Sequence, residues 1–149
     1  MSENFLRLIP SSPEFIPDKN AIDQAVFLLK EDFPYPDMVR VEISDSPRFI
    51  DQGANWERIV CPFCNETLDP GWWQNAMDNA FANKFKNLII RVPCCGIETT
   101  LNDLIYYLPA GFSRFMIEIS NPGRDIADAR INQLETIIGS PLRKIWAHY

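Results

Sequence analysis

The sequence predicts an α+β protein in which two β-α-β units form a ferredoxin-like antiparallel sheet, with a further segment inserted between the units. Two observations carry this prediction. The outer thirds of the chain each follow the order strand, helix, strand, and the middle third holds all four cysteines. We therefore expect a discontinuous α+β domain of residues 1–44 and 112–149, and an inserted subdomain of residues 45–111.

The hydrophobic pattern defines the first unit. Residues 5–9 form a short apolar run that Pro10 ends, and residues 38–44 alternate between apolar and charged side chains, as a half-buried strand does. Between them, apolar residues recur at helical spacing until Phe33 and Pro34 end the helix. These helical apolar positions are Ile22, Ala25, Val26, Leu28 and Leu29.

The second unit repeats this order. Residues 115–119 alternate again, and a helix is predicted from about Asp125 to Ile138, with Gly139 at the position that follows a helix end. Pro141 prevents the helix from continuing, and residues 142–149 predict a last strand. Since these strands alternate, we expect an antiparallel sheet with one covered face and not a doubly wound parallel sheet.

The inserted segment has its own elements. Residues 56–60 and 88–92 predict strands, and residues 100–107 predict a short helix. Asp69 and Pro70 have the residue types of an N-cap and a first helical position, so a second helix is expected to begin there. Its apolar stripe is formed by Trp73, Ala76, Met77, Ala80, Phe81 and Phe85. Trp72 lies off this stripe and is the better candidate for the surface.

The cysteines form two groups, Cys61-Pro62-Phe63-Cys64 and, about thirty residues later, the adjacent pair Cys94-Cys95. A tight C-P-x-C turn points two sulfurs to the same side, and zinc takes four such ligands at tetrahedral corners. Asn65 and Gly96 follow the two groups, and both residue types tolerate the left-handed conformation that ends such turns.

Residues 57–97 resemble the zinc-ribbon and treble-clef families of zinc modules. The resemblance implies a structural zinc ion, Zn²⁺, held by Cys61, Cys64, Cys94 and Cys95. The sequence departs from these families at the adjacent pair, where a second C-x-x-C is expected. Adjacent side chains of an extended strand point in opposite directions, so both sulfurs reach one metal only if the backbone turns. If it does not, the fourth ligand is His148, the only histidine, or water.

Two other uses of the thiols stay open. Disulfides are one, although nothing in the sequence indicates an oxidising compartment. Thiol redox chemistry is the other, because the strand at residues 56–60 and the C-P-F-C turn are similar to the glutaredoxin active-site motif. Val92-Pro93 is likewise similar to the cis-proline segment of that family. A redox cysteine lies at a helix N-terminus, however, and residues 65–69 separate Cys64 from the next predicted helix.

No catalytic site is predicted. The sequence contains no P-loop, no H-E-x-x-H and no G-x-S-x-G motif, and four cysteines leave a zinc ion no open position for water. Glu66 and Glu98, the carboxylates nearest the cysteines in sequence, are expected to be ordinary exposed residues. We therefore expect a non-enzymatic protein, without catalytic residues or an organic cofactor, that acts through protein–protein interaction.

The charge distribution suggests a kind of partner. Residues 1–57 hold five basic and eleven acidic residues, whereas residues 58–149 hold nine of each, so the first part carries the whole net charge of −6. Glu31, Asp32 and Asp37 form a cluster that would attract a basic protein, as an inhibitor or immunity-type protein does. The alternative, a nucleic-acid-associated zinc-ribbon protein, is disfavoured by this charge. No membrane partner and a cytoplasmic location are expected, because no apolar run spans a bilayer and no basic leader precedes the pattern.

Overall fold

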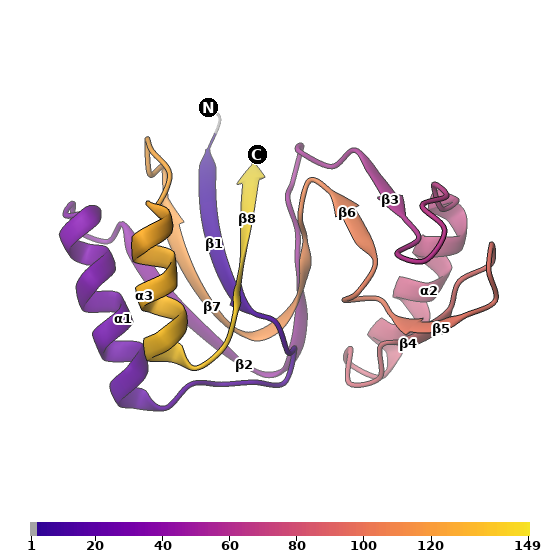
Figure 1. The fold of residues 1–149 in the computed structure, drawn as a ribbon, viewed down its shortest axis with the longest axis horizontal. Helices are drawn as coiled ribbons and strands as arrows, with labels where there is room; N and C mark the ends of the chain where they lie inside the picture. The colour runs from indigo at the N-terminus through magenta and orange to yellow at the C-terminus, as the bar shows by residue number, and fades with distance from the viewer. Residues whose placement is uncertain (1–2) are drawn as a thin grey trace.

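The computed structural model describes residues 3–149 as a mixed α/β chain with three helices. A four-stranded sheet with two helices lies at one end of the molecule, and a smaller part follows at the other end (Figure 1). The first part consists of β1 (Asn4–Pro10), α1 (Lys19–Asp32), β2 (Val39–Ile50), β7 (Gly111–Ser120), α3 (Asp128–Ile138) and β8 (Leu142–His148). The second consists of β3 (Arg58–Val60), α2 (Pro70–Ala82), β4 (Ile89–Arg91), β5 (Glu98–Thr100) and β6 (Ile105–Tyr107).

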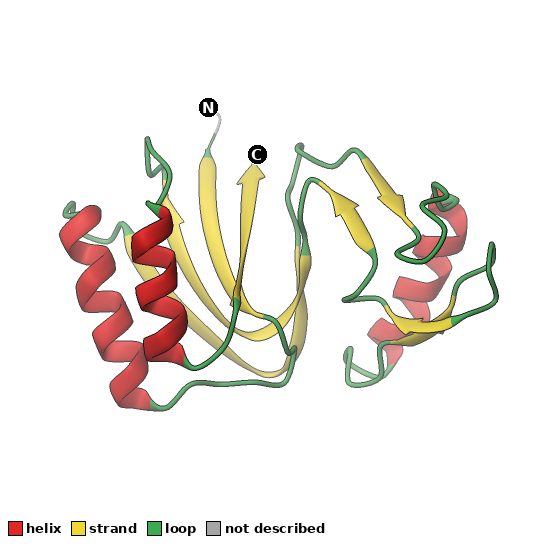
Figure 2. Cartoon of the chain, in the orientation of Figure 1, coloured by secondary structure: helices red, strands yellow, loops and turns green. Residues whose placement is uncertain are grey.

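The large sheet has the strand order β2-β7-β1-β8, and every neighbouring pair is antiparallel. Helices α1 and α3 lie side by side on one of its faces (Figure 2). The predicted alternation holds here, since Leu6, Leu8 and Ile117 point into the helical layer and are fully buried. Burial of such a side chain contributes about 1.5–3 kcal/mol, which makes this layer the main source of stability.

Short-range signals set the ends of the helices. The Asp18 carboxylate accepts the Ala21 N–H at the start of α1, and the Asp69 carboxylate accepts the Trp72 N–H at the start of α2. Gly139 ends α3 in the left-handed conformation, with φ of 84°. Helix α3 begins at Asp128, three residues after the predicted start, because the Asp125 carboxylate bonds instead to Lys144 and to the Ile126 N–H.

Strand β2 is longer than its alternation predicts. It pairs with β7 from Val39 to Ile43 and again from Arg48 to Ile50, with an irregular register between the two stretches. Residues 44–47 contain two serines and a proline and resemble a turn in the sequence, although in the structure they are a bulge within one strand. The second stretch carries the sheet from its helical layer to the smaller part of the molecule.

The smaller part has a separate core, and two sequence predictions are wrong there. Residues 100–107 were predicted to be helical, but β5 ends at Thr100, the chain turns, and β6 pairs with β3. The side chain of Tyr106 explains the strand: it is buried, and its hydroxyl donates to the Leu101 carbonyl over 2.7 Å. Phe81 was predicted to be buried, but it is 69% exposed and packs only at an edge against Phe85.

Aromatic side chains connect the two parts. Phe49 of β2 and Phe112 of β7 have ring centroids 5.1 Å apart, and Phe49 also meets Trp73 of α2 at 5.7 Å. Phe85 lies 5.2 Å from Phe112. Such pairs contribute roughly 0.5–1.5 kcal/mol each beyond the area that they bury. The end of the large sheet is therefore one wall of the smaller core.

An ion network occupies the face of the sheet opposite the helices. The Glu118 carboxylate is nearly buried and accepts hydrogen bonds from Arg7 at 2.9 Å and Arg40 at 2.8 Å. Burial raises the pKa of Glu118, but the hydrogen bonds and charges of the two guanidinium groups outweigh burial, and the net pKa is lowered. The carboxylate thus stays ionised and holds three strands together.

Across residues 3–149, no helix has both the length and the apolar character that a bilayer crossing requires.

We predict that Glu118→Gln lowers the free energy of unfolding at pH 7 by about 1–3 kcal/mol, because it removes the nearly buried carboxylate that two guanidinium groups share. Among residues 3–149, Arg7 then keeps only Asp51, at 3.6 Å, and Arg40 only Glu42, at 3.3 Å, as anionic partners. The native carboxylate contributes fully above its unfolded pKa of about 4.3 and loses this contribution as the pH falls through its lower folded pKa. The difference between wild type and variant, measured by urea unfolding, should therefore shrink below about pH 4. A difference that stays constant down to pH 2.5 contradicts this account.

Candidate metal centre

The first cysteine pair lies on a tight turn that follows β3. The Cys61 N–H donates to the Glu66 carbonyl at 2.9 Å, and the Asn65 N–H donates back to the Cys61 carbonyl at 3.0 Å. Asn65 has a φ of 62°, which closes the turn in the left-handed conformation. The Phe63 N–H points at the Cys61 sulfur over 3.4 Å. Hydrogen bonds of the backbone therefore orient this sulfur without a bound metal.

The second turn, after β4, repeats the first bond for bond. The Val92 N–H donates to the Ile97 carbonyl at 3.1 Å, and the Gly96 N–H donates back to the Val92 carbonyl at 2.8 Å. Gly96 takes the left-handed position, with φ of 71°. In this correspondence Val92 stands where Cys61 stands, and Cys95 stands where Cys64 stands. Cys94 occupies the place of Phe63, one residue before the second ligand position.

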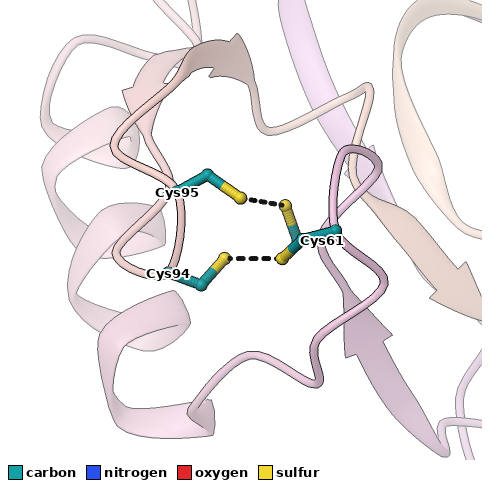
Figure 3. A group of neighbouring side chains, drawn as sticks. Cys61, Cys94 and Cys95 are labelled. Carbon is teal, nitrogen blue, oxygen red and sulfur yellow. Dashed lines mark hydrogen bonds between the residues drawn. The ribbon is translucent and has the colours of Figure 1, made fainter.

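The two turns bring all four sulfurs together. The ligand atoms of Cys61, Cys64, Cys94 and Cys95 lie within 4.8 Å of one another. The Cys61 and Cys95 sulfurs are 4.0 Å apart, and those of Cys64 and Cys94 are 3.4 Å apart. Figure 3 shows Cys94 and Cys95 pointing from their turn toward Cys61. Sulfurs at 2.3 Å from a tetrahedral zinc ion are about 3.8 Å from each other, and the two observed separations lie on either side of this value.

The adjacent pair reaches one centre because its backbone does not extend. Pro93 and Gly96 enclose a turn and not a strand, so the side chains of Cys94 and Cys95 do not alternate across a sheet. Arg91 stabilises the turn from outside, since its guanidinium donates to the Gly96 carbonyl over 2.6 Å. The two turns that carry the cysteines are thereby both held by hydrogen bonds within the chain.

Burial and charge act unequally on the thiols. Burial raises the pKa of Cys61, but the N–H groups of Cys64 and Phe63 outweigh it and lower the pKa to about 7. Contact with Cys64, followed by burial, raises the pKa of Cys95 to about 12, and burial raises the pKa of Cys94. Thiolates this close repel each other, so the group ionises fully only with a cation in its centre.

The centre is half inside the protein. Cys61 is fully buried in the smaller core, together with Val92 and Leu68, whereas Cys64, Cys94 and Cys95 are exposed. The smaller core therefore packs against the Cys61 sulfur, and the other three sulfurs lie on the solvent-exposed side of the segment.

The other residues considered from the sequence lie away from this centre. The His148 Nδ1 is 2.6 Å from the Asn4 side-chain oxygen, at the edge of the large sheet. Glu66 and Glu98 are exposed, and the four cysteines alone form the cluster of metal-ligating side chains found among the described residues. Helix α2 begins at Pro70, so Cys64 has no helix N-terminus beside it of the kind that activates a redox thiol.

Comparison with known proteins adds no relative from which a role can be taken. No protein family model, no curated protein and no solved structure matches the chain. The centre is therefore interpreted from its own geometry, which is compatible with a metal site.

Proposed function

We propose that Cys61, Cys64, Cys94 and Cys95 hold one structural zinc ion that keeps the inserted segment folded. The observation that carries this proposal is the correspondence of the two turns, which aim four sulfurs at one point from segments thirty residues apart. Zinc suits four sulfur ligands at these separations, and its binding energy becomes folding energy when the unfolded chain has no preformed site. In this respect the segment is like a zinc-ribbon module.

We further propose that the whole chain is a ferredoxin-like α+β domain, with residues 45–111 as its zinc-binding insertion. The strand order β2-β7-β1-β8 supports this topology, because it interleaves two β-α-β units. The separate core of the smaller part supports the division. The smaller core shares Phe49 and Phe112 with the end of the large sheet, and this contact explains how an insertion keeps a fixed orientation.

A binding role fits this centre better than catalysis. Four sulfurs complete a tetrahedral shell, so a zinc ion here lacks the open position that activates water or substrate. We propose that the protein is not an enzyme and acts through contact with a protein partner. The four free thiols support a cytoplasmic location, where thiols remain reduced.

The acidic surface proposed for that partner is smaller than the sequence suggests. Asp32 accepts from Arg130 at 2.8 Å, so its charge is compensated within the chain. Glu31 lies 3.6 Å from Arg130 but is 53% exposed, and Asp37 is exposed on the following loop. Attraction of a basic protein, as in an inhibitor or immunity-type interaction, would therefore rest mainly on Glu31 and Asp37.

We predict one zinc ion per chain in protein purified without added metal, measured by elemental analysis. Cys64→Ser should lower the zinc content to less than a tenth of that amount and abolish the cooperative unfolding of the inserted segment, because one lost thiolate removes a large share of the binding energy. Ser46→Ala, a substitution outside the cluster, is the control for zinc lost during purification. Full zinc content in Cys64→Ser, or no metal in the wild type with four titratable thiols, contradicts the proposal.

Because the two turns correspond, a second substitution should restore the zinc binding that a first substitution weakens. Cys94→Ser should weaken zinc binding by at least about 100-fold, since it leaves three thiolates. Adding Val92→Cys should restore most of the affinity, because residue 92 occupies the position of Cys61 and its sulfur completes an ordinary C-x-x-C turn. Competition with a chromogenic chelator measures both steps. If the double variant binds no better than Cys94→Ser, the two turns do not present equivalent positions.

The partner proposal predicts a charge effect. Glu31→Gln combined with Asp37→Asn should lower the recovery of basic proteins from lysate at low salt at least several-fold, because steering depends on exposed charge. Asp37 has a φ of 61°, which asparagine also tolerates, so the fold is kept. Glu14→Gln is the matched control in another exposed position. An unchanged set of bound proteins means that this surface has no role in recognition.

A further inference from the structure

A groove of about 470 Å³ is lined by residues of helix α2 and strand β4, and none of the four cysteines borders it. Its lining includes one tryptophan, Trp72, and one basic residue, Arg91, whose guanidinium also donates to the Gly96 carbonyl of the second cysteine turn. Four asparagines line it as well: Asn75, Asn79, Asn83 and Asn87. Trp72 is half-buried, packs against the smaller core and still borders the groove. The groove therefore combines a fixed aromatic side chain with a row of neutral amides.

The first three amides follow one another along helix α2 to its end, and the fourth is joined to the third by a hydrogen bond. Asn75 and Asn79 are one helical turn apart on α2, Asn83 caps its end, and Asn87 precedes β4. The side-chain carbonyl of Asn83 accepts the Asn87 N–H at 3.1 Å, which fixes the end of the row. In the described chain the side chains of Asn75 and Asn79 make no hydrogen bond, so both amides are available to a ligand.

The charges near the groove are more positive than those of the whole chain, whose net charge is −6. Residues 78–98 contain two acidic residues, Asp78 on α2 and Glu98 opposite Arg91 in the β4–β5 ladder, and three basic residues. The three are Lys84, Lys86 and Arg91, all exposed, and within residues 3–149 none of them forms an ion pair. No carboxylate lines the groove. An anionic ligand is thus favoured over a neutral sugar or a cation.

We propose that this groove binds single-stranded nucleic acid. A base stacks on Trp72, the amides of Asn75 and Asn79 meet the hydrogen-bonding edges of bases, and the three cations contact phosphates. A flat aromatic, paired donor–acceptor amides and nearby positive charge are together the chemistry that a nucleotide strand needs. This inference goes beyond the structural zinc ion and requires only that the inserted segment is folded.

The test uses the full chain with its metal as purified and a fluorescein-labelled strand of twelve thymidines, followed by anisotropy at 50 mM salt. We expect binding that weakens with salt, with a slope of about 0.7 in log–log form for each phosphate contact. Trp72→Ala should weaken binding by about 10-fold or more, since it removes a stacked base. Trp72→Phe, which retains an aromatic ring, should recover most of the loss.

A second variant separates recognition from folding. Asn75→Ala with Asn79→Ala changes exposed positions of α2 to a residue that favours helix, so the fold is retained, and we expect binding to weaken at least 5-fold. Lys84→Ala with Lys86→Ala should lower the salt slope by roughly 0.7–1.4. The controls are Tyr35→Ala and Lys30→Ala, an exposed aromatic residue and a lysine that lie on or next to helix α1 and should not change binding.

Four results of the binding titrations overturn the inference, and one result of a competition experiment does so too. The four are no binding at 50 mM salt, equal losses for Trp72→Ala and Tyr35→Ala, no loss for the asparagine variant, and equal affinity for a strand that lacks bases. The last result would mean that phosphates alone are attracted. A neutral oligosaccharide that competes fully with the thymidine strand assigns the groove to sugars and overturns the inference as well. Zinc content measured on the same samples distinguishes these outcomes from failure of the metal proposal.

Discussion

In the smaller part of the molecule, two turns that are thirty residues apart in the chain approach each other and bring four cysteines together. The strands of this part are three residues long and pair only in twos, and such hairpins are marginal without further support. Helix α2 buries few side chains of its own, chiefly Met77 and Ala80. The four sulfurs are therefore more than a surface feature. They join the turn after β3 to the turn after β4, where Cys61 is buried and the other three cysteines are exposed.

The large sheet is held together by other contacts. Its helical layer buries long apolar side chains on every strand, and its opposite face is joined by the Arg7–Glu118–Arg40 network. The two parts meet where β2 and β7 run on past the helices and place Phe49 and Phe112 against Trp73. The two cores therefore share an aromatic wall, and the large sheet has stabilising contacts of its own.

Sequence reasoning succeeded where one local interaction decides the outcome. Asp69 and Gly139 set helix ends through single residues, and the alternation of residues 115–119 follows from one buried face. The clustering of the four cysteines was also predictable from their spacing. The predictions that failed concern residues whose structure is set by contacts with residues distant in the sequence. Tyr106 lies in a strand because a core made by Phe49 and Trp73 receives it, and no local pattern records that core. The segment Val92-Pro93-Cys94-Cys95-Gly96, in contrast, already has the form of such a turn with its first cysteine displaced, and the backbone bonds of the two turns bear this out.

Net charge was the least informative property of the sequence, because charges act through their neighbours. Several acidic charges are compensated inside the chain, as Asp32 by Arg130 and Glu118 by two arginines. The α2 groove, in contrast, is lined by Arg91 and by no carboxylate, and Lys84 and Lys86 are exposed on the connection that follows α2. Screening limits such fields to about 8–10 Å at physiological salt, so a ligand at the groove experiences Arg91 and its neighbours and not the sum of −6. An acidic protein can therefore present a surface suited to an anion, and the position of each charge matters more than the total.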